Sequence, residues 1–80
     1  MLEWTVTIEG ASDHADEALA DVLVEALQAY SAAVSYGNGR LGVTLTVLAD
    51  RPEQAVSIAC SAYVRVVATQ ATRVEVELAA

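Results

Sequence analysis

The dipeptide Asn38-Gly39 joins two stretches in which apolar and polar residues alternate. Asn-Gly is the commonest signal for a two-residue type I′ turn, because both central residues of that turn need a positive φ. A hairpin closed at this turn over residues 32–37 and 40–48 places Val34 beside Val43 on one sheet face, and a shift by one residue would oppose apolar and polar side chains. The other pairs of this register are Gly37 with Arg40, Tyr36 with Leu41 and Ser35 with Gly42.

Three further segments show the periodicity of a strand or a helix. Residues 2–9 and residues 73–78 alternate between apolar and polar side chains, which predicts two half-buried strands, the first of them broken at Gly10-Ala11. Between the first strand and the hairpin, apolar residues recur at helical spacing after Ser12 or Asp13, and either of these can cap a helix. The expected buried stripe of this helix comprises Ala15, Leu19, Val22, Leu23, Ala26, Leu27 and Tyr30.

A second helix is expected to begin at Asp50-Arg51-Pro52-Glu53. Asp50 is the expected N-cap, Pro52 suits the first turn, and Glu53 stands at the capping-box position. The helical pattern fades near Gln70. The expected buried stripe comprises Val56, Ala59, Cys60, Tyr63, Val66 and Val67.

The order of these elements, β-α-β-β-α-β in 80 residues, predicts a single domain over residues 1–80. Two right-handed crossovers joined by a hairpin give the ferredoxin-like sandwich, an α+β fold. We therefore expect a four-stranded antiparallel sheet in the order 4-1-3-2, with both helices on one face and the other face uncovered.

The charge balance excludes several classes of partner. Eleven acidic residues stand against four arginines, lysine is absent, and the formal net charge is −7. A nucleic-acid binder needs a basic surface, and an anionic membrane repels an acidic chain, so we expect neither partner. No apolar run approaches the roughly 18 residues of a membrane span, and the first residues lack the basic and apolar segments of a signal peptide. We therefore expect a cytoplasmic protein.

Candidates for catalysis and metal binding are few. Cys60 is expected to pack as a small apolar residue on the buried stripe of the second helix. His14 stands among acids in the first turn of the first helix, where a surface histidine is expected; with Glu17 it offers two metal ligands, and nothing else completes a site. The only cysteine and the only histidine lie on different helices, which argues against a nucleophilic pair. We expect no catalytic, cofactor or metal site.

The sheet face away from the helices is the first candidate for binding. In the expected strand order, Thr5 and Thr7 lie on a central strand beside Thr44 and Thr46. One interpretation is a solvated face, which antiparallel sheets commonly have. The other is a stacking face for a second copy or a partner, because threonines form a flat surface of high strand propensity. RNA binders of this topology carry stacking aromatic residues there, and none is expected on this face.

The exposed side of the first helix is the second candidate. Its acidic row has no interleaved base, so it either provides solubility or docks a basic protein partner. The row comprises Asp13, Asp16, Glu17, Asp21 and Glu25.

The outward side of the second helix is the third candidate, because it carries no charge between Glu53 and Arg65. It is either a chance surface of small residues or a contact with another chain, which would add stability to a domain of this size. The expected contact residues are Ser57, Ile58 and Ser61, with Ala62 and Ala68 beside them.

These features predict a non-enzymatic interaction domain that forms a homo-oligomer, above all a dimer, and binds a protein partner through an acidic surface. A cofactor-free enzyme is the least favoured alternative, because the expected interior offers no acid or base.

Length and topology are similar to those of ACT domains, small regulatory modules that bind ligands. The Gly10–Asp13 connection lies where such domains often bind an amino acid. The turn here reads Glu9-Gly10-Ala11-Ser12-Asp13-His14 and lacks the Pro-Gly pair common in that family, so no binding residue is carried over. The resemblance implies the alternative function, a small-molecule-sensing regulatory domain with its ligand at a subunit interface.

Overall fold

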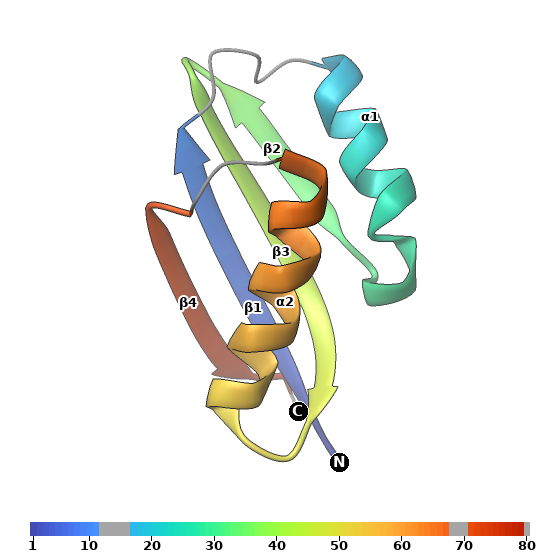
Figure 1. Ribbon diagram of the computed structural model, residues 1–80, viewed down its shortest axis with the longest axis vertical. Helices are drawn as coiled ribbons and strands as arrows, with labels where there is room; N and C mark the ends of the chain where they lie inside the picture. The colour runs from blue at the N-terminus through green and yellow to red at the C-terminus, as the bar shows by residue number, and fades with distance from the viewer. Residues whose placement is uncertain (12–16, 68–70, 80) are drawn as a thin grey trace.

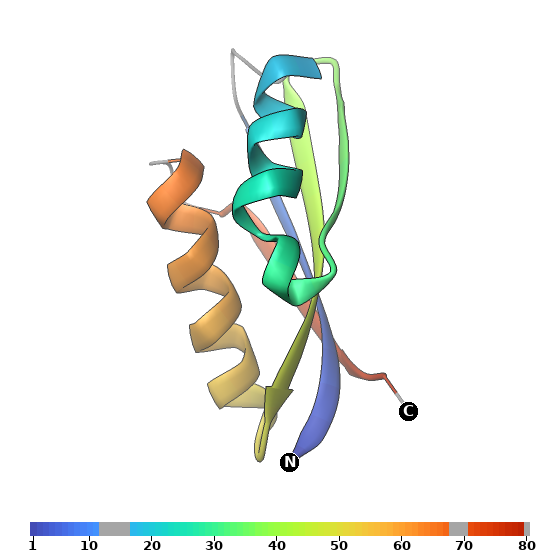
Figure 2. The same ribbon diagram turned by 90° about the vertical axis from the view of Figure 1, so that its right-hand side faces the viewer.

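The computed structural model describes residues 1–11, 17–67 and 71–79, and within them the strands form one open antiparallel sheet (Figure 1). The strand order is β2-β3-β1-β4, which is the expected order read from the opposite edge. The elements are β1 (Leu2–Ala11), α1 (Glu17–Ala26), the 3-10 helix η1 (Gln28–Tyr30), β2 (Ala33–Gly37), β3 (Arg40–Ala49), α2 (Pro52–Val67) and β4 (Arg73–Leu78). Both α-helices lie against the same face of the sheet, α1 over β2 and α2 over the other strands (Figures 1 and 2). The α+β architecture is therefore confirmed.

The hairpin has the predicted turn and register. Asn38 and Gly39 both have a positive φ, 53° and 72°, as a type I′ turn requires. Val34 pairs with Val43, and the other three predicted pairs are present as well. The first strand is longer than predicted, because Gly10 and Ala11 continue the ladder to the first residues of β3.

The core lies between the helices and one face of the sheet, here called the inner face. Its central side chains are completely buried, with relative exposures of 0%. Alternation along each strand explains this, because residues two apart point to the same face. The buried inner-face residues are Val6, Ile8, Leu41, Val43, Leu45, Val47 and Ala49; Leu23 and Leu27 cover them from the α1 side, and Ala55, Ala59 and Tyr63 from α2.

The buried stripe of α1 differs from the predicted one. Ala20 is buried, whereas Val22 is 53% exposed and Ala26 is also exposed. Successive helical residues are about 100° apart, so a helix whose core contact centres on Leu23 turns Val22 sideways. The predicted capping residues Ser12 and Asp13 and the predicted core residue Ala15 lie outside the described residues.

The start of α2 is close to the predicted one. Pro52 is the first residue of the helix, where its missing N–H costs no hydrogen bond. The backbone N–H of Asp50 donates to Oε1 of Gln54 at 3.1 Å, so the side chain that reaches back stands one residue later than Glu53. Of the predicted stripe, Ala59 and Tyr63 are buried and the other four residues are half-buried; Ala55, which was not predicted, is buried too.

Candidate interaction surface

The sheet face opposite the helices, here called the outer face, is uncovered over the described part of the chain (Figure 2). It consists of the alternate residues that the inner face does not use. They are Glu3, Thr5, Thr7, Glu9 and Ala11 of β1; Arg40, Gly42, Thr44, Thr46 and Leu48 of β3; Ala33, Ser35 and Gly37 of β2; and Arg73, Glu75 and Glu77 of β4.

Four threonines occupy the centre of the outer face, as predicted. Thr5 stands directly opposite Thr46, and Thr7 directly opposite Thr44. All four are half-buried although no helix covers them, because neighbouring side chains on the sheet shield one another. The centre of the face is therefore neutral and already partly desolvated.

Charge and side-chain size differ between the two halves of the outer face. The half formed by β1 and β4 carries all four of its glutamates and mostly long side chains. The half formed by β2 and β3 carries no acid, and most of its side chains are small, from Gly42 and Ala33 to the threonines. Its two large residues are Arg40 at the hairpin end and Leu48 at the other end, and Leu48 is 60% exposed.

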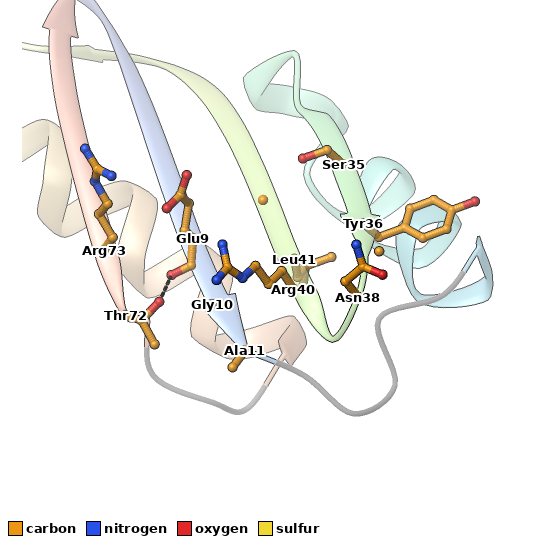
Figure 3. A pocket seen from close by; sticks show the side chains of 12 residues that line it. Glu9, Gly10, Ala11, Ser35, Tyr36, Asn38, Arg40, Leu41, Thr72 and Arg73 are labelled. Carbon is orange, nitrogen blue, oxygen red and sulfur yellow. Dashed lines mark hydrogen bonds between the residues drawn. The ribbon is translucent and has the colours of Figure 1, made fainter.

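A hollow of about 600 Å³ lies at the hairpin end of the outer face (Figure 3). Its floor is open because Gly42, the third residue of β3, has no side chain, and a Cβ built there would lie 2.7 Å from the hydroxyl of Ser35. At the far wall, Thr72 donates both its backbone N–H (2.8 Å) and its hydroxyl (3.1 Å) to the carbonyl oxygen of Glu9, which anchors the entry to β4 beside the end of β1.

Two of the four arginines line this hollow, in a chain of strong negative charge. Arg73 forms an ion pair with Glu75 on the same face of β4. Arg40 reaches from β3 across towards β1 (Figure 3), yet it forms no ion pair or hydrogen bond within the described ranges 1–11, 17–67 and 71–79. Its guanidinium therefore keeps all five donors for another group.

Sequence reasoning missed this hollow, although two signals were present. A glycine inside a strand often marks a close approach of another group, and Gly42 interrupts an otherwise regular alternation. Arg40 and Arg73 also stand at strand starts that the predicted topology brings to one end of the sheet. Neither signal shows whether the surface is hollowed at that place.

The predicted acidic row on α1 is described only in part. Asp21 and Glu25 are exposed and lie one turn apart, and Val22 and Val24 beside them are 53% and 46% exposed. Glu17 is the first residue of α1. Asp13 and Asp16 lie outside the described residues.

The outward side of α2 is smaller than predicted. Ser57 and Ser61 are exposed, but Ile58 and Ala62 are half-buried and pack against the core. α1 packs beside α2, and Ile58 lines an open groove of about 250 Å³ together with Tyr30. Ile58 is therefore less exposed than expected, and its role as a contact with another chain stays a prediction.

The chemistry available for catalysis is limited in the described residues. Cys60 is half-buried on α2 against the core. In the parts of the chain that the structure describes, no three His, Cys, Asp or Glu side chains converge on a point where they could hold a metal ion. None of the described helices is both long and apolar enough to cross a bilayer.

Comparisons of this chain with protein-family models, with curated proteins and with solved structures found no match.

Proposed function

We propose that this chain is a non-enzymatic, ferredoxin-like interaction domain that acts in the cytoplasm and forms a homodimer through its outer face. The observation that carries the proposal is the uncovered outer face itself, a sheet surface with half-buried, neutral threonines at its centre. Desolvating neutral hydroxyls on association costs less than desolvating charges, and interfaces accordingly exclude charge from their core and tolerate it at the rim.

The size of the outer face suits a dimer. The two longer extents of the molecule are 35 Å and 22 Å, so one face projects onto at most about 770 Å². A standard interface buries roughly 800 Å² per partner, so a dimer of this kind would use most of the face. A domain of this length has a small core, so burial against a second copy would also add to its stability.

A dimer formed in this way leaves α1 on the opposite side of each protomer, away from the interface (Figure 2). Asp21 and Glu25 then stay accessible to a basic protein partner, which acidic side chains attract over a distance of roughly 8–10 Å at moderate salt. In this proposal the outer face makes the dimer and the acidic row recruits the partner.

Sedimentation velocity over a range of micromolar concentrations tests the proposal. The wild-type chain should sediment as a dimer, and Thr44→Glu should sediment as a monomer, because it places a charge at the centre of the face. Gln28→Glu adds the same charge on exposed η1 and should remain dimeric, and Ser57→Glu does so on α2. A wild-type monomer at every concentration would refute the proposal, and a monomeric Ser57→Glu beside a dimeric Thr44→Glu would move the interface to α2.

The hollow supports a second candidate function, the sensing of a small molecule at the subunit interface. Its volume of about 600 Å³ lies within the range of roughly 300–1,000 Å³ for ligand pockets. Its lining includes Gly10 and Ala11, the start of the segment at which the ACT resemblance predicts a ligand. A thermal-shift screen with amino acids and nucleotides tests this function: a compound that raises Tm at near-stoichiometric dose, and no longer does so in Arg40→Ala, would favour it over a purely structural dimer. A screen without any stabilising compound would discard it.

A further inference from the structure

We propose that the two outer faces of the dimer stack about a two-fold axis that runs along the strands, between β1 and β3, so that Glu9 of each copy enters the hollow over Gly42 of the other and meets its Arg40. This inference rests on the proposed self-association through the outer face. It adds the orientation of the second copy and the pair of residues that determines it.

The register of the sheet supplies the geometry. A two-fold axis along the strands places β1 of the second copy over β3 of the first, and β4 of the second copy over β2 of the first. The position of each residue along the strand direction is unchanged by this rotation. The residue placed over Gly42 is then its cross-strand partner Glu9 from the second copy, because the two stand directly opposite each other within one sheet. In the same way Thr5 is placed over Thr46, and Thr7 over Thr44. Such an interface is isologous, as a closed dimer requires.

Side-chain size favours this axis. The half of the face formed by β1 and β4 carries long side chains, and the half formed by β2 and β3 carries mostly small ones. The exchange sets long residues against small ones at three places, Glu9 over Gly42, Arg73 over Ser35, and Glu75 over Ala33. At the end away from the hairpin it sets Glu3 over the larger Leu48. The hollow of about 600 Å³ is the space that a long side chain from the second copy would fill.

Charge favours the same axis. Every glutamate of the outer face lies on β1 or β4, so the exchange sets the acidic half of one copy over the acid-free half of the other. An axis across the strands would instead stack β4 of one copy on β4 of the other and bring their two Glu75 side chains towards each other. Like charges held close together weaken association. Stacking along the strands also agrees with the small angle at which twisted sheets pack face to face.

This arrangement supplies Arg40 with an ion-pair partner from the second copy. It stands two positions along β3 from the hollow floor on the same face, diagonal to Glu9 of its own chain, and makes no ion pair with the described residues. A carboxylate arriving over Gly42 would come within reach of the guanidinium fork, which binds carboxylates through two parallel hydrogen bonds. The hydroxyl of Ser35 borders the same hollow and can donate to that carboxylate.

Mixing two charge-reversed variants tests the inference. Arg40→Glu alone sets two carboxylates against each other across the interface, and Glu9→Arg alone sets two guanidinium groups against each other. Each variant should therefore dimerise about tenfold more weakly than wild type or worse. In the heterodimer that forms from an equimolar mixture, both sites carry an opposite-charge pair, in the wild-type arrangement at one site and with the two charges exchanged at the other. Heterodimers should therefore form more tightly than either homodimer in sedimentation velocity. Because Glu9 and Arg40 are also neighbours within one chain, only recovery on mixing shows that the pair joins two chains.

The other outcomes are distinct. If both single variants dimerise as tightly as wild type, or if the mixture stays as weak as its components while wild type dimerises, the pairing is wrong and the proposed self-association still holds. If a mixture of Arg40→Glu with Glu3→Arg recovers instead, the axis runs across the strands and the inference is overturned. A monomeric wild-type chain refutes both the inference and the proposed function. Circular dichroism of each variant confirms that the exposed substitutions leave the fold intact.

Discussion

The two faces of the sheet share the same strands and differ only in which alternate residues they take. The inner face presents Val6 and Leu45, with no exposed surface, to two helices. The outer face presents Thr5 and Thr46, neighbours of these residues in the chain, and no helix covers it in the described part of the chain. Alternation thus separates two tasks within each strand: the inner residues stabilise the protomer, and the outer residues are free to contact another molecule.

This comparison predicts that inner-face substitutions change folding stability and that outer-face substitutions change association. Stability is therefore measured by urea unfolding at protein concentrations low enough to keep the chain monomeric, since association would otherwise add to the apparent value. The expected effects follow from the largest to the smallest.

Truncation in the centre of the sheet should give the largest difference between the faces. Leu45→Ala should lower the free energy of unfolding by roughly 2–5 kcal/mol, because it removes buried methyl groups and leaves a cavity. Thr46→Ala, the next residue on the other face, should cost less than about 1 kcal/mol. Equal losses at the two positions would show that the outer face is also packed within the protomer.

An isosteric exchange sharpens the comparison, since valine and threonine have nearly the same shape. Val6→Thr should cost about 1–3 kcal/mol, because it buries a hydroxyl among apolar side chains. Thr5→Val on the outer face should change stability by no more than about 0.5 kcal/mol. A destabilising Thr5→Val would indicate that the outer hydroxyl already has a structural partner.

Polar contacts of the two faces should also differ. The indole N–H of Trp4 donates to the carbonyl of Ala49 at 3.0 Å in a partly buried corner, and Trp4→Phe should cost about 1 kcal/mol or somewhat more through loss of this bond and of ring contacts. Arg73→Ala removes the exposed ion pair with Glu75 and should cost less than about 1 kcal/mol, falling further in high salt. A larger loss for Arg73→Ala than for Trp4→Phe would contradict this ranking.

The smallest effect is expected on α1, remote from the outer face. Asp21→Arg replaces a like-charge contact with Glu25 one turn away by an opposite-charge one, and it should stabilise the helix by about 0.2–0.5 kcal/mol per contact. The same substitution should weaken capture of a basic partner. Unchanged stability together with unchanged capture would leave the acidic row with solubility as its remaining role.

The fold could be predicted further than the site. Strand alternation and the Asn38-Gly39 turn are local signals with a fixed period, so the register of the hairpin and the separation of the two faces followed from them. Helix orientation depends on the neighbouring helix, which explains why Val22 is exposed and Ile58 is half-buried against the prediction. The position of the outer threonines was predicted, because it needs only alternation and strand order.

The hollow and the difference between the two halves of the outer face could not be predicted from the residue pattern by the same reasoning. Both depend on which strands become neighbours and on the space left by a missing side chain. Gly42 shows this most clearly, because its effect arises from Ser35 and Glu9 on two other strands. A surface property of this kind becomes visible only when the cross-strand register is known residue by residue.

The most direct test of the central claim, that a second copy covers the outer face, is a dilution series of ¹H–¹⁵N NMR spectra of the wild-type chain. The account predicts concentration-dependent shifts at the amides of Thr5, Thr7, Thr44 and Thr46, with Ser57 and Ser61 on α2 unchanged. Shifts confined to α2, or spectra that do not change from the lowest to the highest concentration of a monomeric chain, would contradict it.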